Sequence, residues 1–139
     1  MDTLVIIKAT GKETGGQYGL IEEVDPPGYE PPLHVHHNED EAFVILEGEV
    51  TFTIGEQCIR AVPGAYVFAP RGVPHIFKVE GNASARMLTF NYPAGFEQFF
   101  VELGRPAPGP VLPTAGEPNE AEMAKLLELA EKYGLQILG

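Results

Sequence analysis

Three of the four histidines in this 139-residue chain fall within four positions. His34, His36 and His37 lie in the segment PPLHVHHNEDEAFVILEG (31–48), and His75 lies far downstream in APRGVPHIFKV. Side chains two apart in a strand point to the same face, so His34 and His36 can direct their rings at one point. His37 then points away, and we expect it to be solvated or hydrogen-bonded rather than to bind a ligand.

Three adjacent acids follow the histidines, and the strand pattern separates them. Glu41 heads the apolar run AFVIL, so it should share the inward alternation that also places Phe43 inside. Asn38, Glu39 and Asp40 fit a solvent-exposed turn. Glu41 is therefore the acid that we expect to join His34 and His36.

The turn APRGVP delivers His75 to the start of another strand. If His75 faces inward, Phe77 and Val79 follow it on the same face, and Lys78 lies outside, where its charge costs least. Three imidazoles and one carboxylate suit a divalent transition metal and leave coordination positions open for water, substrate or dioxygen. A closed structural zinc site usually draws on cysteine, and Cys58 stands alone. The alternative is an exposed polar loop and a hydrogen-bonded histidine in the core.

Short strands must position these side chains. Sixteen glycines and thirteen prolines separate runs that are rich in branched and aromatic residues, from about residue 17 to residue 92. These runs are QYGLIEEV, AFVILEG, EVTFTI, CIRAV, AYVFAP, HIFKV and SARMLTFNY. Their even spacing predicts an all-β fold, an antiparallel sandwich or barrel. Cys58, in CIRAV, is expected to be a buried, inert thiol.

The period of the pattern changes after the last predicted strand. Phe96, Phe99, Phe100 and Leu103 follow helical spacing, and Gly104 ends the run, so we expect a short helix whose aromatic stripe seals the barrel. Residues 1–104 are thus interpreted as the barrel domain with this helix, and 105–118 as a proline-rich linker.

A second helix is predicted in the C-terminal segment, residues 119–139. Asn119 can cap it and Gly134 can end it. Its apolar stripe comprises Met123, Leu126, Leu127 and Ala130. We expect this helix to cover a barrel end or to contact a second subunit, and the sequence does not separate these options.

The charge and composition restrict the partners. Nine basic residues against twenty acidic ones give a net charge of −11, which disfavours nucleic acid and anionic membranes as partners. No stretch approaches the length of a membrane span, the N-terminal MDTLVIIKAT has an acid where a signal peptide carries basic residues, and the single cysteine fits a reducing compartment. We expect a cytoplasmic protein whose partner is a small molecule.

Two ordered motifs resemble those of the cupin superfamily. In the first, GYEPPLHVHHNEDEAFVILEG, every specified position matches: Gly28, His34, His36, Glu41 and Gly48. In the second, GAYVFAPRGVPHIFKV, the matches are Gly64, Pro70, Gly72 and His75, whereas Val79 replaces the usual asparagine. Within the superfamily the two blocks are most similar to single-domain quercetin 2,3-dioxygenase-like cupins.

The resemblance implies a small antiparallel β-barrel of the cupin or jelly-roll type, followed here by C-terminal helices. It implies one divalent transition metal ion (Fe, Mn, Ni, Co, Cu or Zn) held by His34, His36, Glu41 and His75. It further implies a homodimer and a metal-dependent, dioxygenase-like enzyme acting on an aromatic or enolic substrate, with Glu41 as ligand or catalytic base.

Inward-facing Phe43, Phe77 and Val79 are expected to line the substrate pocket. Two alternatives remain open: a non-oxidative isomerase, cyclase or decarboxylase at the same metal, and a small-molecule-binding protein without turnover.

Overall fold

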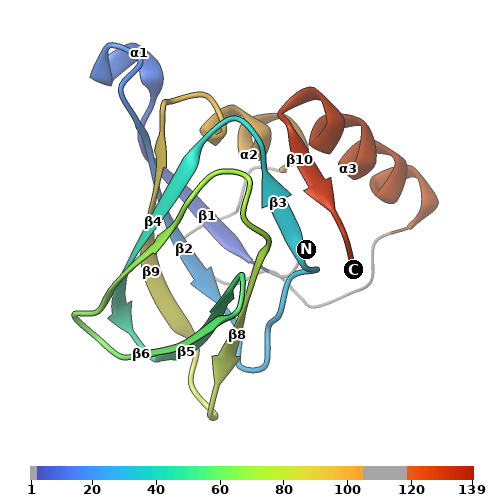
Figure 1. The fold of residues 1–139 in the computed structure, drawn as a ribbon. Coiled ribbons are helices and arrows are strands. Elements are labelled where there is room, and N and C mark those ends of the chain that lie inside the picture. The colour runs from blue at the N-terminus through green and yellow to red at the C-terminus, as the bar shows by residue number, and fades with distance from the viewer. Residues whose placement is uncertain (1–2, 105–118) are drawn as a thin grey trace.

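Two five-stranded antiparallel sheets make up most of the structure, a computed structural model that describes residues 3–104 and 119–139 (Figure 1). The strands are β1 (Leu4–Ala9), β2 (Gly19–Asp25), β3 (His34–His36), β4 (Asp40–Glu47), β5 (Glu49–Ile54), β6 (Gln57–Ala61), β7 (Tyr66–Ala69), β8 (His75–Glu80), β9 (Ala85–Tyr92) and β10 (Leu135–Ile137). The helices are α1 (Gly11–Thr14), α2 (Glu97–Leu103) and α3 (Glu120–Lys132). The first sheet has the order β1-β2-β9-β4-β7 and the second the order β10-β3-β8-β5-β6.

The core lies between the two sheets. Alternation along each strand turns one set of side chains inward, as in β5, where every second residue is buried. Phe43 and Met87 from the first sheet meet Phe52 and Phe77 from the second in one buried cluster. This arrangement confirms the predicted all-β fold of jelly-roll type with C-terminal helices.

The seven predicted strand runs all form strands, the histidine segment forms β3 as expected, and two further strands complete the sheets. β1 pairs with β2 at the edge of the first sheet, and β10 pairs with β3 at the edge of the second. Leu135, Gln136 and Ile137 of β10 lie opposite His36, Val35 and His34. The strand that carries two candidate ligands is therefore held on one side by the C-terminal segment.

Glycines close the turns next to the candidate site. Gly72 has φ +78° and donates its N–H to the carbonyl of His36 at 2.8 Å, so the turn before β8 is tied to the end of β3. Gly48 has φ +83°, and a Cβ there would lie 2.7 Å from the Ser84 carbonyl oxygen. Only glycine meets both conditions at position 48.

The two longer helices pack against each other, and α3 also packs against β10 (Figure 1). Asn119 caps α3 by accepting a hydrogen bond from the Glu122 N–H at 2.8 Å, as predicted. The second core cluster joins the helices: Phe96, Phe99 and Leu129 are buried there. The predicted linker 105–118 lies outside the described residues, and the division into three segments stays a prediction.

The apolar stripe of α3 is shifted from the predicted one. Leu129 and Ala130 are buried, and Leu126 packs partly against the second core cluster. Met123 and Leu127 remain 41% and 53% exposed, so the described part of the chain provides no cover for them.

Cys58 is exposed, so the prediction of a buried thiol was wrong. β6 is the edge strand of its sheet, and Cys58 lies opposite Thr53 of β5. Thr53 faces outward, because its neighbours Phe52 and Ile54 face the core. The side chain of Cys58 therefore points to the outer face. Among the described helices none has the length and apolar character needed to cross a membrane.

Candidate metal centre

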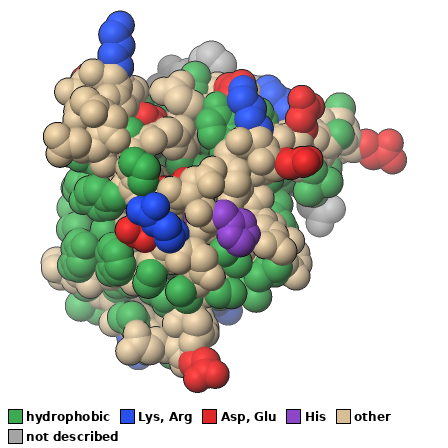
Figure 2. All heavy atoms as spheres, turned by 45° about the horizontal axis from the view of Figure 1, so that its top comes forward, with side chains coloured by type: hydrophobic (Ala, Val, Ile, Leu, Met, Phe, Trp, Pro, Cys, Tyr) green, Lys and Arg blue, Asp and Glu red, His purple; other side chains and the backbone are tan. Residues whose placement is uncertain are grey.

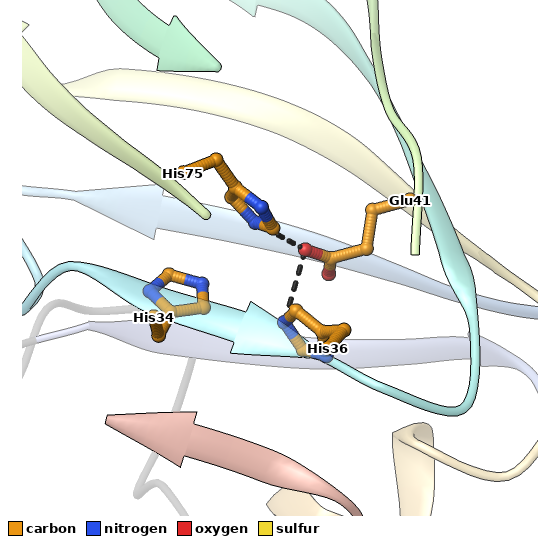
Figure 3. Close-up of side chains that lie close together, drawn as sticks. All are labelled: His34, His36, Glu41 and His75. Carbon is orange, nitrogen blue, oxygen red and sulfur yellow. Dashed lines mark hydrogen bonds and ion pairs between the residues drawn. The ribbon is translucent and has the colours of Figure 1, made fainter. Parts of the chain in front are cut away.

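Four side chains from three strands point toward one another (Figure 3). His34 and His36 come from β3, Glu41 from β4 and His75 from β8, and one ligand atom from each lies within 4.8 Å of the others. His34 is directly opposite His75 in the sheet. The set predicted from the sequence is therefore brought together, and His36, Glu41 and His75 are buried.

Each of the three rings is held by its Nδ1 atom. Nδ1 of His34 lies 2.7 Å from the Pro32 carbonyl oxygen, and Nδ1 of His75 lies 3.3 Å from that of Val73. Nδ1 of His36 lies 2.8 Å from Oε1 of Glu39. Because carbonyl and carboxylate oxygens only accept, each Nδ1 donates, and Nε2 is left to face the centre.

Glu41 occupies the middle of the group. Its Oε1 accepts hydrogen bonds from Nε2 of His36 at 3.0 Å and of His75 at 2.9 Å, and its Oε2 accepts one from Nδ2 of Asn91 at 3.0 Å. Burial would raise the pKa of Glu41, but the two histidines outweigh it and hold this pKa well below its usual value. The carboxylate is therefore ionised.

The two histidines of β3 differ in their pKa values. Burial lowers the pKa of His36, but Glu41 and Glu39 more than compensate and raise it to about 10, so the ring carries a positive charge between two carboxylates. Burial, followed by the charge of His75, lowers the pKa of His34 to about 4, which leaves that ring neutral. Three imidazoles and one carboxylate that converge in this way are a donor set that fits a divalent transition metal, which would displace the proton of His36.

His37 lies outside this group, as predicted. Its side chain is exposed, and Nε2 lies 2.8 Å from Oε1 of Gln136 on β10. The strand alternation therefore separates it correctly from His36.

Glu39 does not lie in a solvent-exposed turn, so that prediction was wrong. It is 4% exposed and contacts His36, because the chain turns back after β3 and brings position i+3 beneath the ring. Asp40 is partly exposed and pairs with Arg71, with the Arg71 N–H donating to Oδ1 at 2.8 Å. The spacing of three between His36 and Glu39 was the signal for the missed contact.

Two further neighbours of the centre were not predicted. Asn91 follows Thr89 on the inward face of β9, and a buried asparagine in that alternation was the available signal for its bond to Glu41. The ring of Phe96 stands edge-on to the ring of His36, with 4.5 Å between the centroids. The aromatic residue at the start of α2 therefore reaches the candidate ligands.

The predicted pocket residues are buried between the sheets. Phe43, Phe77 and Val79 are 3%, 6% and 1% exposed and belong to the main core cluster. The ring of Phe43 lies 6.3 Å from that of His75, so the apolar interior begins directly behind the centre. Their contact with a substrate stays a prediction.

A second pair of carboxyl groups lies inside the fold on β2. Asp25 is fully buried, and neither of its oxygens receives a hydrogen bond in the described structure. Its neighbour is the carboxyl group of Glu23, which is also only an acceptor when ionised, so the pair must hold a proton. Burial, and then the charge of Glu23, raise the pKa of Asp25 to about 10, while burial and then Glu41 raise that of Glu23 to about 7.

Comparison with known proteins gives one family. A family model described as "Cupin domain" matches residues 20–91, which include all four candidate ligands. The quercetin 2,3-dioxygenase of Bacillus subtilis (strain 168) is 29% identical over 137 residues, a match that covers 99% of this chain. The chain spans only 40% of the length of that relative.

Solved structures have the same architecture. The protein TT1209 from Thermus thermophilus is 28% identical, with a TM-score of 0.59 over 66% of this chain and 84% of that one. A predicted oxalate decarboxylase from Thermotoga maritima is 22% identical, with a TM-score of 0.62 over 66% of this chain and 80% of that one. At this identity the second likeness concerns the fold alone.

Proposed function

The chain belongs to the cupin family, whose model covers just over half of it, and on this premise we propose that it is a metal-dependent enzyme acting on a small organic molecule. More specifically, we propose a quercetin-dioxygenase-like oxygenase of an aromatic or enolic substrate. The observation that carries the proposal is the convergence of His34, His36, His75 and Glu41, with each histidine held through Nδ1. The likeness to the Bacillus subtilis quercetin 2,3-dioxygenase supports the choice of reaction.

His34, His36 and His75 would hold the metal through Nε2, and Glu41 would contribute Oε1. A redox-active divalent metal, when bound, supplies Lewis acidity toward a substrate oxygen and electron transfer with dioxygen. Asn91 fixes the other oxygen of Glu41, so Oε1 keeps its direction toward the centre.

Glu41 is also the group that we propose as the base. When Oε1 is not bound to the metal, the ionised carboxylate can accept a proton from an enolic or phenolic hydroxyl beside it: the substrate O–H bond breaks and a new O–H bond forms at Oε1. The side chain is buried and its pKa is held low, so Glu41 would be a weak base that passes the proton on instead of keeping it. Phe43, Phe77 and Val79 would contact the aromatic part of the substrate.

The proposal includes a small molecule as the substrate and neither nucleic acid nor a membrane as a partner. It is supported by the net charge of −11. Figure 2 shows one face on which basic side chains lie beside acidic ones at several places instead of forming a continuous stripe. We also propose a cytoplasmic homodimer.

The test is oxygen consumption. The protein is loaded separately with Fe²⁺, Mn²⁺, Ni²⁺, Co²⁺ or Cu²⁺, mixed with a flavonol under argon and then exposed to oxygen. We expect oxygen uptake with ring-opened product, loss of uptake in His75→Ala and Glu41→Gln, and wild-type uptake in His37→Ala, whose ring lies outside the centre.

Two results would redirect the proposal. Turnover under argon would support a non-oxidative isomerase, cyclase or decarboxylase. Binding of the flavonol with recovery of the unchanged compound, and no oxygen uptake with any of these metals, would refute oxygenase activity toward flavonols.

A further inference from the structure

We propose that Glu39 is a positioning residue of the metal centre, which orients the ring of His36 and makes its Nε2 a stronger metal ligand. The inference rests on the metal-binding role proposed above and adds a residue that neither cupin motif specifies. It concerns the only one of the three histidines whose described Nδ1 partner carries a charge.

The three Nδ1 contacts divide into two kinds. His34 and His75 each donate to a backbone carbonyl, of Pro32 and Val73 respectively, two residues earlier in the chain. His36 donates to a side chain, the carboxylate of Glu39, at 2.8 Å. Backbone carbonyls are present whatever the sequence, whereas the contact to His36 depends on the residue at position 39.

The environment of Glu39 makes this contact more than a surface ion pair. The side chains of His36 and Glu39 are 4% and 5% exposed. A glutamate in a three-acid turn could remain in water at no cost, whereas burial removes it from water and must be offset by a specific partner. Its acidic neighbour Asp40 is instead paired with Arg71 in a more exposed position.

A carboxylate on the Nδ1 side of a metal-binding histidine has two effects. It fixes the tautomer, so that the Nε2 lone pair is available, and it increases the electron density of the ring and thus the donor strength of Nε2. Loss of such a partner typically weakens metal binding by roughly 10- to 100-fold. In this chain the ring of His36 is also confined on another side by Phe96, with 4.5 Å between centroids, so the two contacts together limit its rotation.

Three variants separate orientation from charge. Glu39→Gln keeps an amide oxygen that can accept from Nδ1 but removes the negative charge, and Glu39→Ala removes both. Asp40→Asn is the matched control, because it neutralises the adjacent acid without touching His36. Far-UV circular dichroism and thermal melts establish that each variant is folded, and Glu39→Gln carries the test if Glu39→Ala does not fold.

The readouts are metal binding by the protein and not turnover. Zn²⁺ affinity is measured by competition with a chromophoric chelator, and the visible absorption of the Co²⁺-loaded protein reports the ligand field. We expect roughly 10- to 100-fold weaker Zn²⁺ binding in Glu39→Ala, a smaller loss with a shifted Co²⁺ band in Glu39→Gln, and wild-type values in Asp40→Asn.

The outcomes distinguish failure of the role of Glu39 from failure of the metal centre itself. If the wild-type protein binds Zn²⁺ and Co²⁺ and both Glu39 variants bind them equally well with an unchanged Co²⁺ band, the role of Glu39 is refuted and the metal centre stands. An equal loss in Asp40→Asn would refute it as well, since the effect would then be general to the acidic turn. If the wild-type protein binds neither metal, the metal centre and this inference fail together.

Discussion

Replacing Asp25 by asparagine should stabilise the protein at neutral pH, which is unusual for a substitution of a fully buried residue. Asp25 lies opposite Ala85 in the first sheet and faces the interior, with no donor for either oxygen in the described structure. Burial is the main reason that its pKa is raised from 3.8 to about 10, and the charge of Glu23 adds to it. The folded protein therefore keeps Asp25 protonated where the unfolded chain ionises it.

The direction and size of this change in the free energy of unfolding follow from proton linkage. Because the pKa of Asp25 is raised in the folded state, its contribution to the free energy of unfolding is fully present below pH 3.8 and is lost as the pH rises toward 10, since unfolding then releases a proton. Each pH unit in that window costs the folded state about 1.4 kcal/mol, which sums to about 4 kcal/mol at pH 7. Asparagine has nearly the same shape and no such proton, and its amide can donate to Glu23.

Urea unfolding measures this contribution directly. Metal-free wild-type and Asp25→Asn proteins are unfolded at pH 6, 7 and 8, with circular dichroism as the signal. We expect the variant to be more stable at pH 7 by up to about 4 kcal/mol, and the difference to grow by about 1.4 kcal/mol per pH unit.

Asp40→Asn is the control of opposite sign. Hydrogen bonds from Arg71 lower the pKa of Asp40, so its contribution is present above pH 3.8 and disappears as the pH falls through the lowered value. Its loss should cost about 1 kcal/mol or less at pH 7 and change little between pH 6 and 8. An Asp25→Asn variant that is no more stable than wild type at pH 7, or whose advantage does not change with pH, would refute the reasoning.

Three further predictions concern the scaffold and the assembly. A chain ending at residue 118 loses β10 from the edge of β3, and Zn²⁺ affinity should fall by roughly 10-fold or more in a competition titration; unchanged affinity would show that β3 needs no such support. Gly48→Ala should lower the free energy of urea unfolding by about 2 kcal/mol or more, because it combines a positive φ with a 2.7 Å approach to the Ser84 oxygen. Gly81→Ala, with φ +73° and open space around the Cβ, should cost less, and equal losses would contradict the role of the contact. Light scattering should give about twice the chain mass of 15.1 kDa for the proposed homodimer, and the monomer mass would contradict it.

Most of the fold and all four candidate ligands could be predicted, because both depend on local alternation. The spacing of His34 and His36 separates them from His37, and the same rule places Glu41 and His75 inward. Prediction failed where the facing of a strand or the path of a turn was misjudged. Cys58 is exposed because it lies on the outer face of β6, opposite Thr53 and on the same face as the exposed Arg60, and its apolar character suggested the inner face.

The missed features of the site depend on one tight turn and on contacts between distant segments. Glu39 resembles a solvent-exposed acid in a polar turn until the fold of that turn brings it to Nδ1 of His36. Asn91 and Phe96 reach the centre from elements distant in the sequence, and β10 was hidden by its length of three residues. Pairing between segments as distant in the sequence as β10 and β3 is decided by tertiary packing and not by local pattern.

Metal content tests the central claim most directly. Zn²⁺ is added to the wild-type protein and to the single variants His34→Ala, His75→Ala and His37→Ala. After desalting, the metal content of each is measured by inductively coupled plasma mass spectrometry. We predict roughly one equivalent per chain in the wild type and in His37→Ala, and a strong loss in the other two variants. Absence of metal from the wild type, or equal retention in His34→Ala, His75→Ala and His37→Ala, would contradict the proposed centre.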